Sequence, residues 1–158
     1  MKFNNKFYIA LLILGLIIVA GCSQAKKTDV STVSNSNGQV TIFKSPGCGC
    51  CNVYSQYMGR KGFDVKVVDT DNLSPVKSQY NIPSSMQSCH TTVIGNYFVE
   101  GHVPVEAIEK LMEEKPDIAG IAMPGMPSGS PGMTGAKKGA FVVYAVHKDG
   151  STSEFMRI

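Results

Sequence analysis

The sequence contains no tryptophan, and it has only a small excess of positive charge. Its 158 residues include 15 lysines and arginines and 12 aspartates and glutamates, which gives a formal net charge of +3. Lys2 and Lys6 lie in a segment that we expect to be removed, and without these two lysines 13 basic residues remain beside the 12 acidic ones. A nearly neutral chain offers no electrostatic basis for binding nucleic acid, which needs a basic surface.

Long apolar runs are scarce as well, and the one clear example is too short to span a membrane. Residues 7–20 are almost uninterrupted apolar sequence of about 14 residues, whereas a spanning helix needs roughly 20. The run follows two lysines and ends at Val19-Ala20-Gly21-Cys22, which is typical of the lipobox of bacterial lipoproteins. We therefore predict that residues 1–22 are a lipoprotein signal peptide with its lipidation residue, Cys22. The alternative is a short uncleaved anchor.

The remaining chain divides into a tether and one domain. Residues 23–39 are rich in Ser, Thr, Asn and Lys, too polar to bury a core, and we predict that they form a flexible tether. Residues 40–158 are long enough for a single domain with its own core. We expect this domain to lie outside the cytoplasm, on the periplasmic side or at the cell surface, attached to a membrane through the N-terminal lipid.

Hydrophobic periodicity and turn residues predict an α/β fold for this domain. We expect strands at 40–43, 63–68, 91–94 and 97–100 and helices at 51–60, 74–80 and 104–115. The order β-α-β-α-β-β-α is that of the thioredoxin-like fold, in which the first two strands are parallel. Residues 116–139 fit no regular element, and two further strands, 140–146 and 152–158, are expected to form an appended C-terminal β-hairpin. The first helix is expected to bury Val53, Tyr54, Tyr57 and Met58.

Three of the five cysteines lie within four positions of one another. The segment Ser45-Pro46-Gly47-Cys48-Gly49-Cys50-Cys51 connects the first strand to the first helix, so the thiols should lie at a helix N-terminus. There the helix dipole and the unpaired backbone N–H groups favour thiolate over thiol. Cys48 and Cys51 have the spacing of a redox-active CxxC pair, with Cys48 attacking and Cys51 resolving. The alternative is a structural disulfide between these two, with Cys50 a packed free thiol.

A fourth thiol, Cys89, lies just before the predicted third strand. In a thioredoxin-like fold the loop that enters this strand packs against the CxxC turn, so we expect Cys89 to face the other three thiols. Dithiol exchange needs neither Cys50 nor Cys89, whereas four converging thiols suit a thiophilic metal. A tetrahedral zinc site is disfavoured because the adjacent Cys50 and Cys51 can hardly both point at one ion. Sulfur atoms that bridge several Cu(I) ions relax that constraint.

Histidines and methionines supply further candidate copper ligands. His90 adjoins Cys89, and His102 precedes the third helix; the alternatives are a hydrogen-bonded loop histidine and a helix-capping role. The loop rich in Pro and Gly carries thioethers that suit Cu(I) outside the cell, namely those of Met123, Met126 and Met133. The alternative for these methionines is apolar packing that holds the loop down.

Four motifs occur in order along residues 40–158. They are Ser-Pro-x-Cys-Gly-Cys-Cys, Ser-Cys-His-Thr, Glu-Gly-His-Val-Pro and Pro-Gly-Met-Pro-x-Gly-Ser-Pro-Gly-Met. In these motifs the chain resembles the CopG-type copper-resistance proteins, also catalogued as a metal-binding domain family of unknown function and distinct from the DNA-binding repressor of the same name. The resemblance implies a thioredoxin-like fold, an exported setting and copper binding with redox turnover between copper states. The thiolates that it implies as ligands are those of Cys48, Cys50, Cys51 and Cys89.

Two functions are consistent with these sequence features. The first is an extracytoplasmic protein of copper resistance that binds Cu(I) through clustered thiolates and exchanges copper or electrons with partner proteins. The second is a thioredoxin-like thiol–disulfide oxidoreductase that acts on proteins. The two can coexist, because Cu(I)/Cu(II) interconversion coupled to a dithiol is itself an oxidoreductase reaction. A redox-inert structural lipoprotein would need neither the methionine loop nor the crowded thiols.

Overall fold

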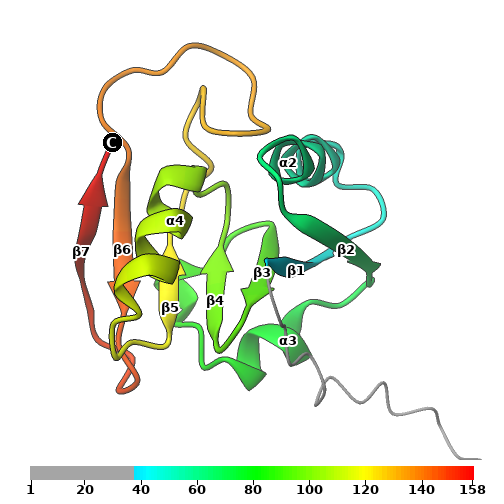
Figure 1. Ribbon diagram of the computed structural model, residues 1–158. Helices are drawn as coiled ribbons and strands as arrows, with labels where there is room; N and C mark the ends of the chain where they lie inside the picture. The colour runs from blue at the N-terminus through cyan, green and yellow to red at the C-terminus, as the bar shows by residue number, and fades with distance from the viewer. Residues whose placement is uncertain (1–37) are drawn as a thin grey trace, which may run out of the picture.

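The computed structural model describes residues 38–158, which form a seven-stranded mixed sheet with helices on both faces (Figure 1). The strands are β1 (Gln39–Lys44), β2 (Asp64–Asp69), β3 (His90–Ile94), β4 (Tyr97–Glu100), β5 (Gly120–Ala122), β6 (Val142–Val146) and β7 (Thr152–Arg157). The helices are α2 (Gly49–Arg60), α3 (Ser74–Gln79) and α4 (Val105–Glu114), with a short 3-10 helix, η1 (Ser84–Met86).

The strands follow the order β2-β1-β3-β4-β5-β6-β7 across the sheet. The parallel strands β1 and β2 are connected through α2, and Gln39 lies opposite Asp64. The third strand, β3, is antiparallel to both of its neighbours, β1 and β4. Beyond β4 the sheet continues with β5, which is parallel to β4, and then with the antiparallel hairpin of β6 and β7.

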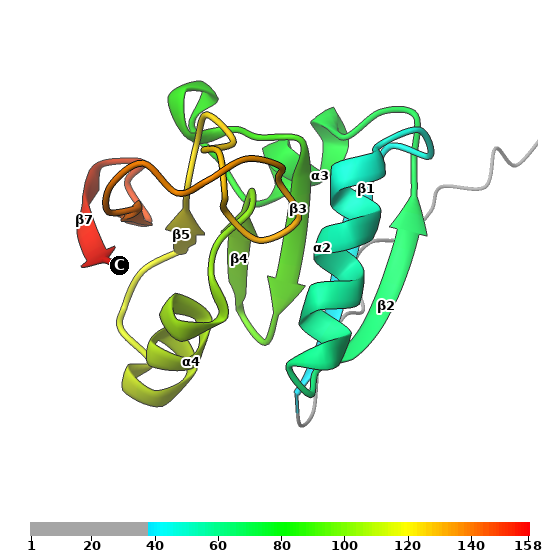
Figure 2. The same ribbon diagram turned by 90° about the horizontal axis from the view of Figure 1, so that it is seen from above.

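Alternate residues of the strands pack into cores on opposite faces of the sheet, as the two-residue period of a strand requires. On one face, Ile42 of β1 belongs to the main core together with Tyr54 of α2 and Ile108 of α4. On the other face, Phe43 of β1 packs with Val76 of α3. Helices α2 and α4 therefore cover one face of the sheet and α3 covers the other, and both views show this arrangement (Figures 1 and 2).

The predicted α/β class and the predicted order of elements are confirmed, with boundaries that differ by one or two residues. The C-terminal hairpin is present as well, and β5 connects it to the rest of the sheet. The prediction that residues 116–139 contain no regular element is wrong, because β5 lies there. Three residues are too few to show a hydrophobic alternation. Gly120 lets β5 approach β4 closely, since a Cβ atom at this position would lie 2.3 Å from the Phe98 carbonyl oxygen.

The predicted burial of Val53 is also wrong. Its side chain is 45% exposed, and the buried residues of α2 are Cys51, Tyr54 and Met58. These three recur at intervals of three and four residues, so they lie on one face of the helix. The buried stripe therefore starts at Cys51, whose side chain lies inside the domain.

Residues 123–141 connect β5 to β6 and cross the end of the sheet where α2 begins. Figure 2 shows this loop, drawn in yellow and orange, reaching from the end of β5 towards α2 and returning to β6. Backbone hydrogen bonds close turns within the loop, among them Met133 N to Ser130 O at 2.9 Å and Gly129 N to Thr134 O at 3.2 Å. The loop is thus a folded part of the domain.

Among residues 38–158, no helix has both the length and the apolar character that crossing a membrane requires. The predicted signal peptide, the lipidation residue Cys22 and almost all of the predicted tether lie outside the described residues. These three assignments stay predictions.

Candidate metal centre

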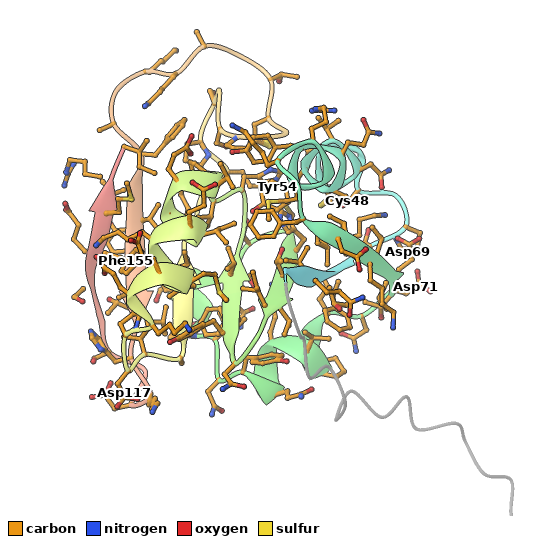
Figure 3. All side chains as sticks on the ribbon, viewed as in Figure 1. Cys48, Tyr54, Asp69, Asp71, Asp117 and Phe155 are labelled. Carbon is orange, nitrogen blue, oxygen red and sulfur yellow. A yellow bond between two sulfur atoms is a disulfide. The ribbon has the colours of Figure 1, made fainter. Side chains whose placement is uncertain are left out.

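The first three thiols lie where a strand turns into a helix. Cys48 is the N-cap residue of α2, and Cys50 and Cys51 belong to its first turn (Figure 3, where Cys48 is labelled). The turn is closed by a hydrogen bond from Cys48 N to Ser45 O at 3.1 Å. Lys44, which is almost fully buried, also donates to Ser45 O. The predicted position of these thiols at a helix N-terminus is confirmed.

Cys48 and Cys51 form a disulfide, while Cys50 is a free thiol. The sulfur of Cys50 lies 3.5 Å from the sulfur of Cys48. Both the CxxC redox pair and the structural disulfide predict this pairing, so the pairing alone does not choose between them. The short distance between the free thiol and the disulfide places a potential attacking group beside the bond.

Cys89 brings a fourth sulfur to the same place from a distant part of the chain. It directly precedes β3, which pairs with β1, and its backbone carbonyl oxygen lies 3.8 Å from the disulfide-bonded sulfur of Cys51. The sulfur atoms of Cys48, Cys50, Cys51 and Cys89 all lie within 4.8 Å of one another. The convergence predicted from the sequence is therefore present in the fold.

His102 faces Cys89 from the turn after β4. Its Nε2 lies 3.1 Å from the Cys89 sulfur, and its Nδ1 lies 2.6 Å from the carbonyl oxygen of Pro131. A carbonyl can only accept, so Nδ1 carries the proton and Nε2 keeps a lone pair directed at the thiol. Histidines that bind metals usually have their second nitrogen fixed in this way. Burial lowers the pKa of His102.

His90 lies beside the same thiol, and its ring packs edge-on against that of His102, with 4.8 Å between the ring centroids. Its Nδ1 is 3.4 Å from the Cys89 sulfur, and its Nε2 is a buried atom without a hydrogen-bond partner among the described residues. Its ring packs 4.5 Å from the ring of Tyr54. Burial, with smaller effects from His102 and Lys77, lowers the pKa of His90 to about 3. A neutral imidazole with an unused nitrogen is available as a metal ligand.

Cys89 thus belongs to two possible ligand sets, the four thiols and the group Cys89, His90 and His102. Burial and the nearby Cys50 raise the pKa of Cys89 to about 11. The metal-free protein therefore carries this group as a thiol at neutral pH, and a metal that binds Cys89 must displace its proton.

The loop between β5 and β6 reaches the site through Pro131 and Gly132. A Cβ atom at Gly132 would lie 2.7 Å from Cys50 O and 2.9 Å from Tyr54 N, so only glycine fits against α2. The φ angle of +85° at Gly132 favours glycine for a second reason. The loop rich in Pro and Gly is therefore packed against the thiol turn.

The three candidate methionines of this loop differ in their surroundings. Met123 is fully buried in the main core, and its backbone N–H donates to Glu100 O at 3.0 Å. Met126 is 42% exposed, and Met133, which follows Gly132, is partly buried. The burial of Met123 agrees with the packing alternative. Copper ligation by any of the three stays a prediction.

The sequence predicted Tyr54 and Tyr57 as packing residues of the first helix, but it did not predict the hydrogen bonds by which they support the site. The hydroxyl of Tyr54 donates to Val103 O at 3.0 Å, and the hydroxyl of Tyr57 accepts from Val105 N at 2.9 Å, so two tyrosines of α2 secure the turn that carries His102. Also missed was a buried ion pair between Lys77 and Glu100. A usable signal existed for Glu100: Phe98 and Glu100 alternate along β4, so both must point to the same buried face.

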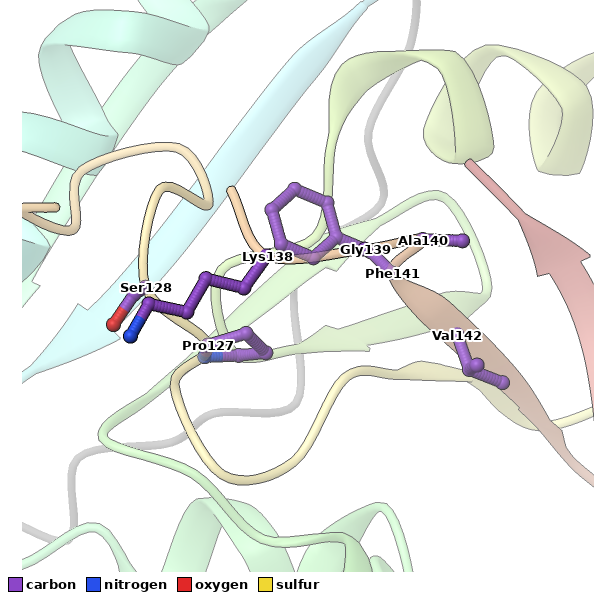
Figure 4. Close-up of a pocket in the computed structure, with 7 residues that line it drawn as sticks. All are labelled: Pro127, Ser128, Lys138, Gly139, Ala140, Phe141 and Val142. Carbon is purple, nitrogen blue, oxygen red and sulfur yellow. The ribbon is translucent and has the colours of Figure 1, made fainter. Parts of the chain in front are cut away.

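A separate hollow of about 230 Å³ lies between the loop and the start of β6 (Figure 4). Its lining is formed by Pro127, Ser128, Lys138, Gly139, Ala140, Phe141 and Val142. None of these residues is a thiol or an imidazole, so the hollow is distinct from the candidate metal centre.

Known proteins are similar to this chain in both sequence and fold. Residues 86–133 match a family described as "Protein of unknown function, DUF411". A solved structure named "Copper resistance protein copG- Form 1" is 39% identical with a TM-score of 0.72, and the match covers 78% of this chain and 98% of that chain. A second, "Form 2", is 40% identical with a TM-score of 0.71, covering 76% and 97%. The chain belongs to the CopG-type copper-resistance family. No curated protein sequence matches the chain.

The resemblance that was drawn from four short motifs is thereby confirmed. The family model covers the second, third and fourth of these motifs, from Met86 to Met133. The donors gathered in this CopG-type chain are thiols and neutral imidazoles, which are the ligands that copper and other thiophilic metals prefer.

Proposed function

We propose that this chain is a copper-binding protein of copper resistance that binds Cu(I) through clustered thiolates. The observation that carries the proposal is the meeting of four sulfur atoms, from α2 and from the start of β3, within 4.8 Å of one another. The names of the two similar structures support copper as the metal. Thiolates are soft ligands, and Cu(I) is the copper state that they favour.

The arrangement of the four sulfur atoms suits two or more copper ions better than a single ion. Cys50 and Cys51 are adjacent in the first turn of α2, so their side chains leave the helix in different directions. Sulfur atoms that each bridge two ions satisfy such a set, and His90 and His102 supply nitrogen donors at its edge. We infer a multinuclear Cu(I) site centred on Cys50 and Cys89.

Copper binding and thiol oxidation are linked at Cys48 and Cys51. These two sulfurs form a disulfide, and they become copper ligands only after reduction by two electrons with uptake of two protons. In the reverse direction, two Cu(II) ions accept one electron each from the two thiols. The products are two Cu(I) ions, one disulfide and two protons. We propose this coupled reaction as the redox activity of the protein.

We further infer a thioredoxin-like core and an extracytoplasmic location. Support for the core comes from the strand order β2-β1-β3-β4, with β1 parallel to β2 and β3 antiparallel to both neighbours. Support for the location comes from the lipobox that ends at Cys22. A protein anchored there would exchange copper or electrons with other exported proteins.

Anaerobic titration of the fully reduced protein with Cu(I), against a competing Cu(I) chelator, tests the proposal. We expect several tightly bound copper ions per chain in the wild type and in the control His147→Gln, whose imidazole lies outside the site. Cys50→Ser and Cys89→Ser should each lose tight binding, because each removes a bridging sulfur. Copper binding that is absent from the wild type, or unchanged in both serine variants, would contradict the proposal.

The disulfide at the N-terminus of α2 also favours a second candidate, a thiol–disulfide oxidoreductase. Such an enzyme needs Cys48 and Cys51 but neither Cys50 nor Cys89. Reduction of a protein disulfide that survives Cys50→Ser and Cys89→Ser, is lost in Cys48→Ser and occurs without tight copper binding would support this candidate instead.

A further inference from the structure

Beneath the segment that carries Cys89 lies a buried pair of opposite charges. Lys77 of α3 and Glu100 of β4 form a salt bridge, with side chains that are 9% and 0% exposed. The pair lies on the face of the sheet that α3 covers, opposite the face covered by α2. Glu100 is the last residue of β4, two positions before His102. The pair is therefore close to the site but contains none of its thiols or imidazoles.

The remaining hydrogen bonds of the pair go to the residues on either side of Cys89 and His90. One carboxylate oxygen of Glu100 accepts from Ser88 N at 2.6 Å, and the other accepts from the Thr91 hydroxyl at 2.6 Å. The ammonium of Lys77 donates to Ser88 O at 3.0 Å. Both backbone groups of Ser88 are thus fixed, and its carbonyl belongs to the peptide bond that leads into Cys89.

A contribution to stability does not by itself explain why this pair is buried. Burying two charges is costly, and replacing a buried pair by apolar side chains is often neutral or stabilising. Apolar residues here would, however, remove the partners of Ser88 N and Ser88 O. Without those partners the segment before β3 could move relative to α2, because Cys89 meets α2 only through weak contacts, those among the sulfur atoms and the 3.8 Å contact of its carbonyl oxygen with the Cys51 sulfur.

The end of β4 also organises the other parts of the site. Gly101 N donates to His90 O at 3.1 Å, and the carbonyl of Glu100 accepts from Met123 N where the loop begins. A Cβ atom at Gly101 would lie 2.9 Å from the Ser88 side chain, so the two segments are in close contact. A displacement of Glu100 would therefore displace Cys89 and His102 together.

We propose that Lys77 and Glu100 act as a positioning pair that fixes Cys89 against the thiols of α2 and against His102. The role of the pair in copper binding rests on the proposed function. Its effect on the geometry of the thiols does not, and can be measured without metal.

The metal-free test uses dibromobimane, a bifunctional reagent that becomes fluorescent when it bridges two neighbouring thiols. In the oxidised protein Cys48 and Cys51 form their disulfide, so among residues 38–158 the reagent reports on Cys50 and Cys89; Cys22 is replaced by serine in every protein compared. The test variants are Glu100→Gln and Lys77→Met, which keep side-chain size and remove one charge. Ile108→Ala, a cavity variant in α4 outside the site, is the control for lost stability.

We expect both charge variants to bridge Cys50 and Cys89 more slowly than the wild type, while the control keeps the wild-type rate. In the reduced protein the same variants should bind Cu(I) about 10 to 100 times more weakly, the usual effect of removing a group that orients a metal ligand. If a charge variant does not fold, Thr91→Val decides, because it removes one donor to Glu100 and leaves the charges paired.

Wild-type bridging rates in the variants, or an equal loss in Ile108→Ala, would overturn the proposal. A wild type that binds no Cu(I) but shows the expected differences in bridging would refute the copper function and leave the positioning role standing. Normal bridging in the variants, beside tight copper binding by the wild type, would refute the positioning role alone.

Discussion

At the scale of single residues, Cys89 is the side chain on which the two donor groups depend. Its sulfur lies among the thiols of α2 and also 3.1 Å from His102 Nε2. The Pro131 carbonyl of the loop accepts a hydrogen bond from Nδ1 of His102 and so fixes the tautomer of this histidine. The site therefore combines donors from three segments of the chain, and the loop supports one of them through Pro131.

The buried histidines predict a loss of stability in acid. The pKa of His90 is about 3 in the folded protein, against 6.5 for an exposed histidine, and burial lowers the pKa of His102 as well. The unfolded chain binds these protons and the folded chain does not, so the free energy of unfolding should fall as the pH drops from about 6.5 towards 3. The loss is at most about 1.4 kcal/mol per pH unit for each histidine.

Urea unfolding of the metal-free protein at pH 7 and at about pH 4.5 measures this effect. His90→Gln should reduce the difference between the two values, whereas His147→Gln, beside the β6–β7 turn, should leave it as in the wild type. An unchanged difference in His90→Gln would show that His90 is not the group responsible.

Tyr54 and Tyr57 make a second prediction at the same scale. Tyr54→Phe removes the donor to Val103 O in a fully buried position and leaves that carbonyl without its partner, which should cost about 1–3 kcal/mol of unfolding free energy. Tyr57→Phe removes the acceptor of Val105 N at a partly exposed position where water can replace it, so its cost should be smaller. Equal costs in urea unfolding would contradict this ranking.

At the scale of elements, the loop between β5 and β6 depends on one close contact with α2. We predict that Gly132→Ala displaces the loop, because the added Cβ atom would lie 2.7 Å from Cys50 O. Gly125→Ala is the matched control: its φ of +82° is nearly the +85° of Gly132, but a Cβ atom there would meet nothing within 4 Å. The control should cost only the backbone strain, about 1 kcal/mol.

Limited proteolysis of the loop, together with urea unfolding, distinguishes the two variants. Gly132→Ala should be cleaved faster and lose more stability than Gly125→Ala. Identical cleavage of both variants would mean that the contact of Gly132 with α2 does not hold the loop.

The elements that the sequence predicts well are those whose pattern is local. Helix α2 follows from Pro and Gly before Cys48 and from the spacing of Tyr54 and Met58, and the hairpin follows from its turn at 148–150. Strand β5 could not be found this way, because three residues show no period and its partner β4 lies some 20 residues earlier in sequence.

The candidate site was predictable to the same degree. The four thiols and His102 carry distinctive chemistry, so the expected fold was enough to bring them together. The sequence predicts Lys77 only as a residue of a short helix, because nothing near it in the sequence indicates that its side chain points inward towards β4. Its role depends on a contact between residues 23 positions apart.

At the scale of the whole molecule, the sheet is one continuous layer from β2 to β7. The hairpin of β6 and β7 contributes Phe141, Val143 and Ala145 to the main core, and it covers the edge of β5. The same hairpin anchors the far end of the loop that reaches the thiols. The C-terminal strands are therefore part of the structure on which the site depends.

Removal of residues 140–158 should abolish the folded state. The truncation uncovers apolar side chains of the core and leaves the edge of β5 without a partner, which favours aggregation. Circular dichroism and gel filtration would reveal the loss. A chain that begins at Gly38 is the control, and it should keep the unfolding free energy of the longer protein. A truncated chain that stays monomeric and folded would contradict this view of the hairpin.

The central claim is that copper binds to the sulfur atoms gathered by α2 and β3. Copper K-edge X-ray absorption of the Cu(I)-loaded protein tests it most directly, because the nearest scattering shell reports the ligand type. We expect sulfur to dominate that shell in the wild type, and Cys89→Ser to lose both copper and sulfur scattering. A shell of nitrogen and oxygen alone, or a spectrum that Cys89→Ser leaves unchanged, would contradict the claim.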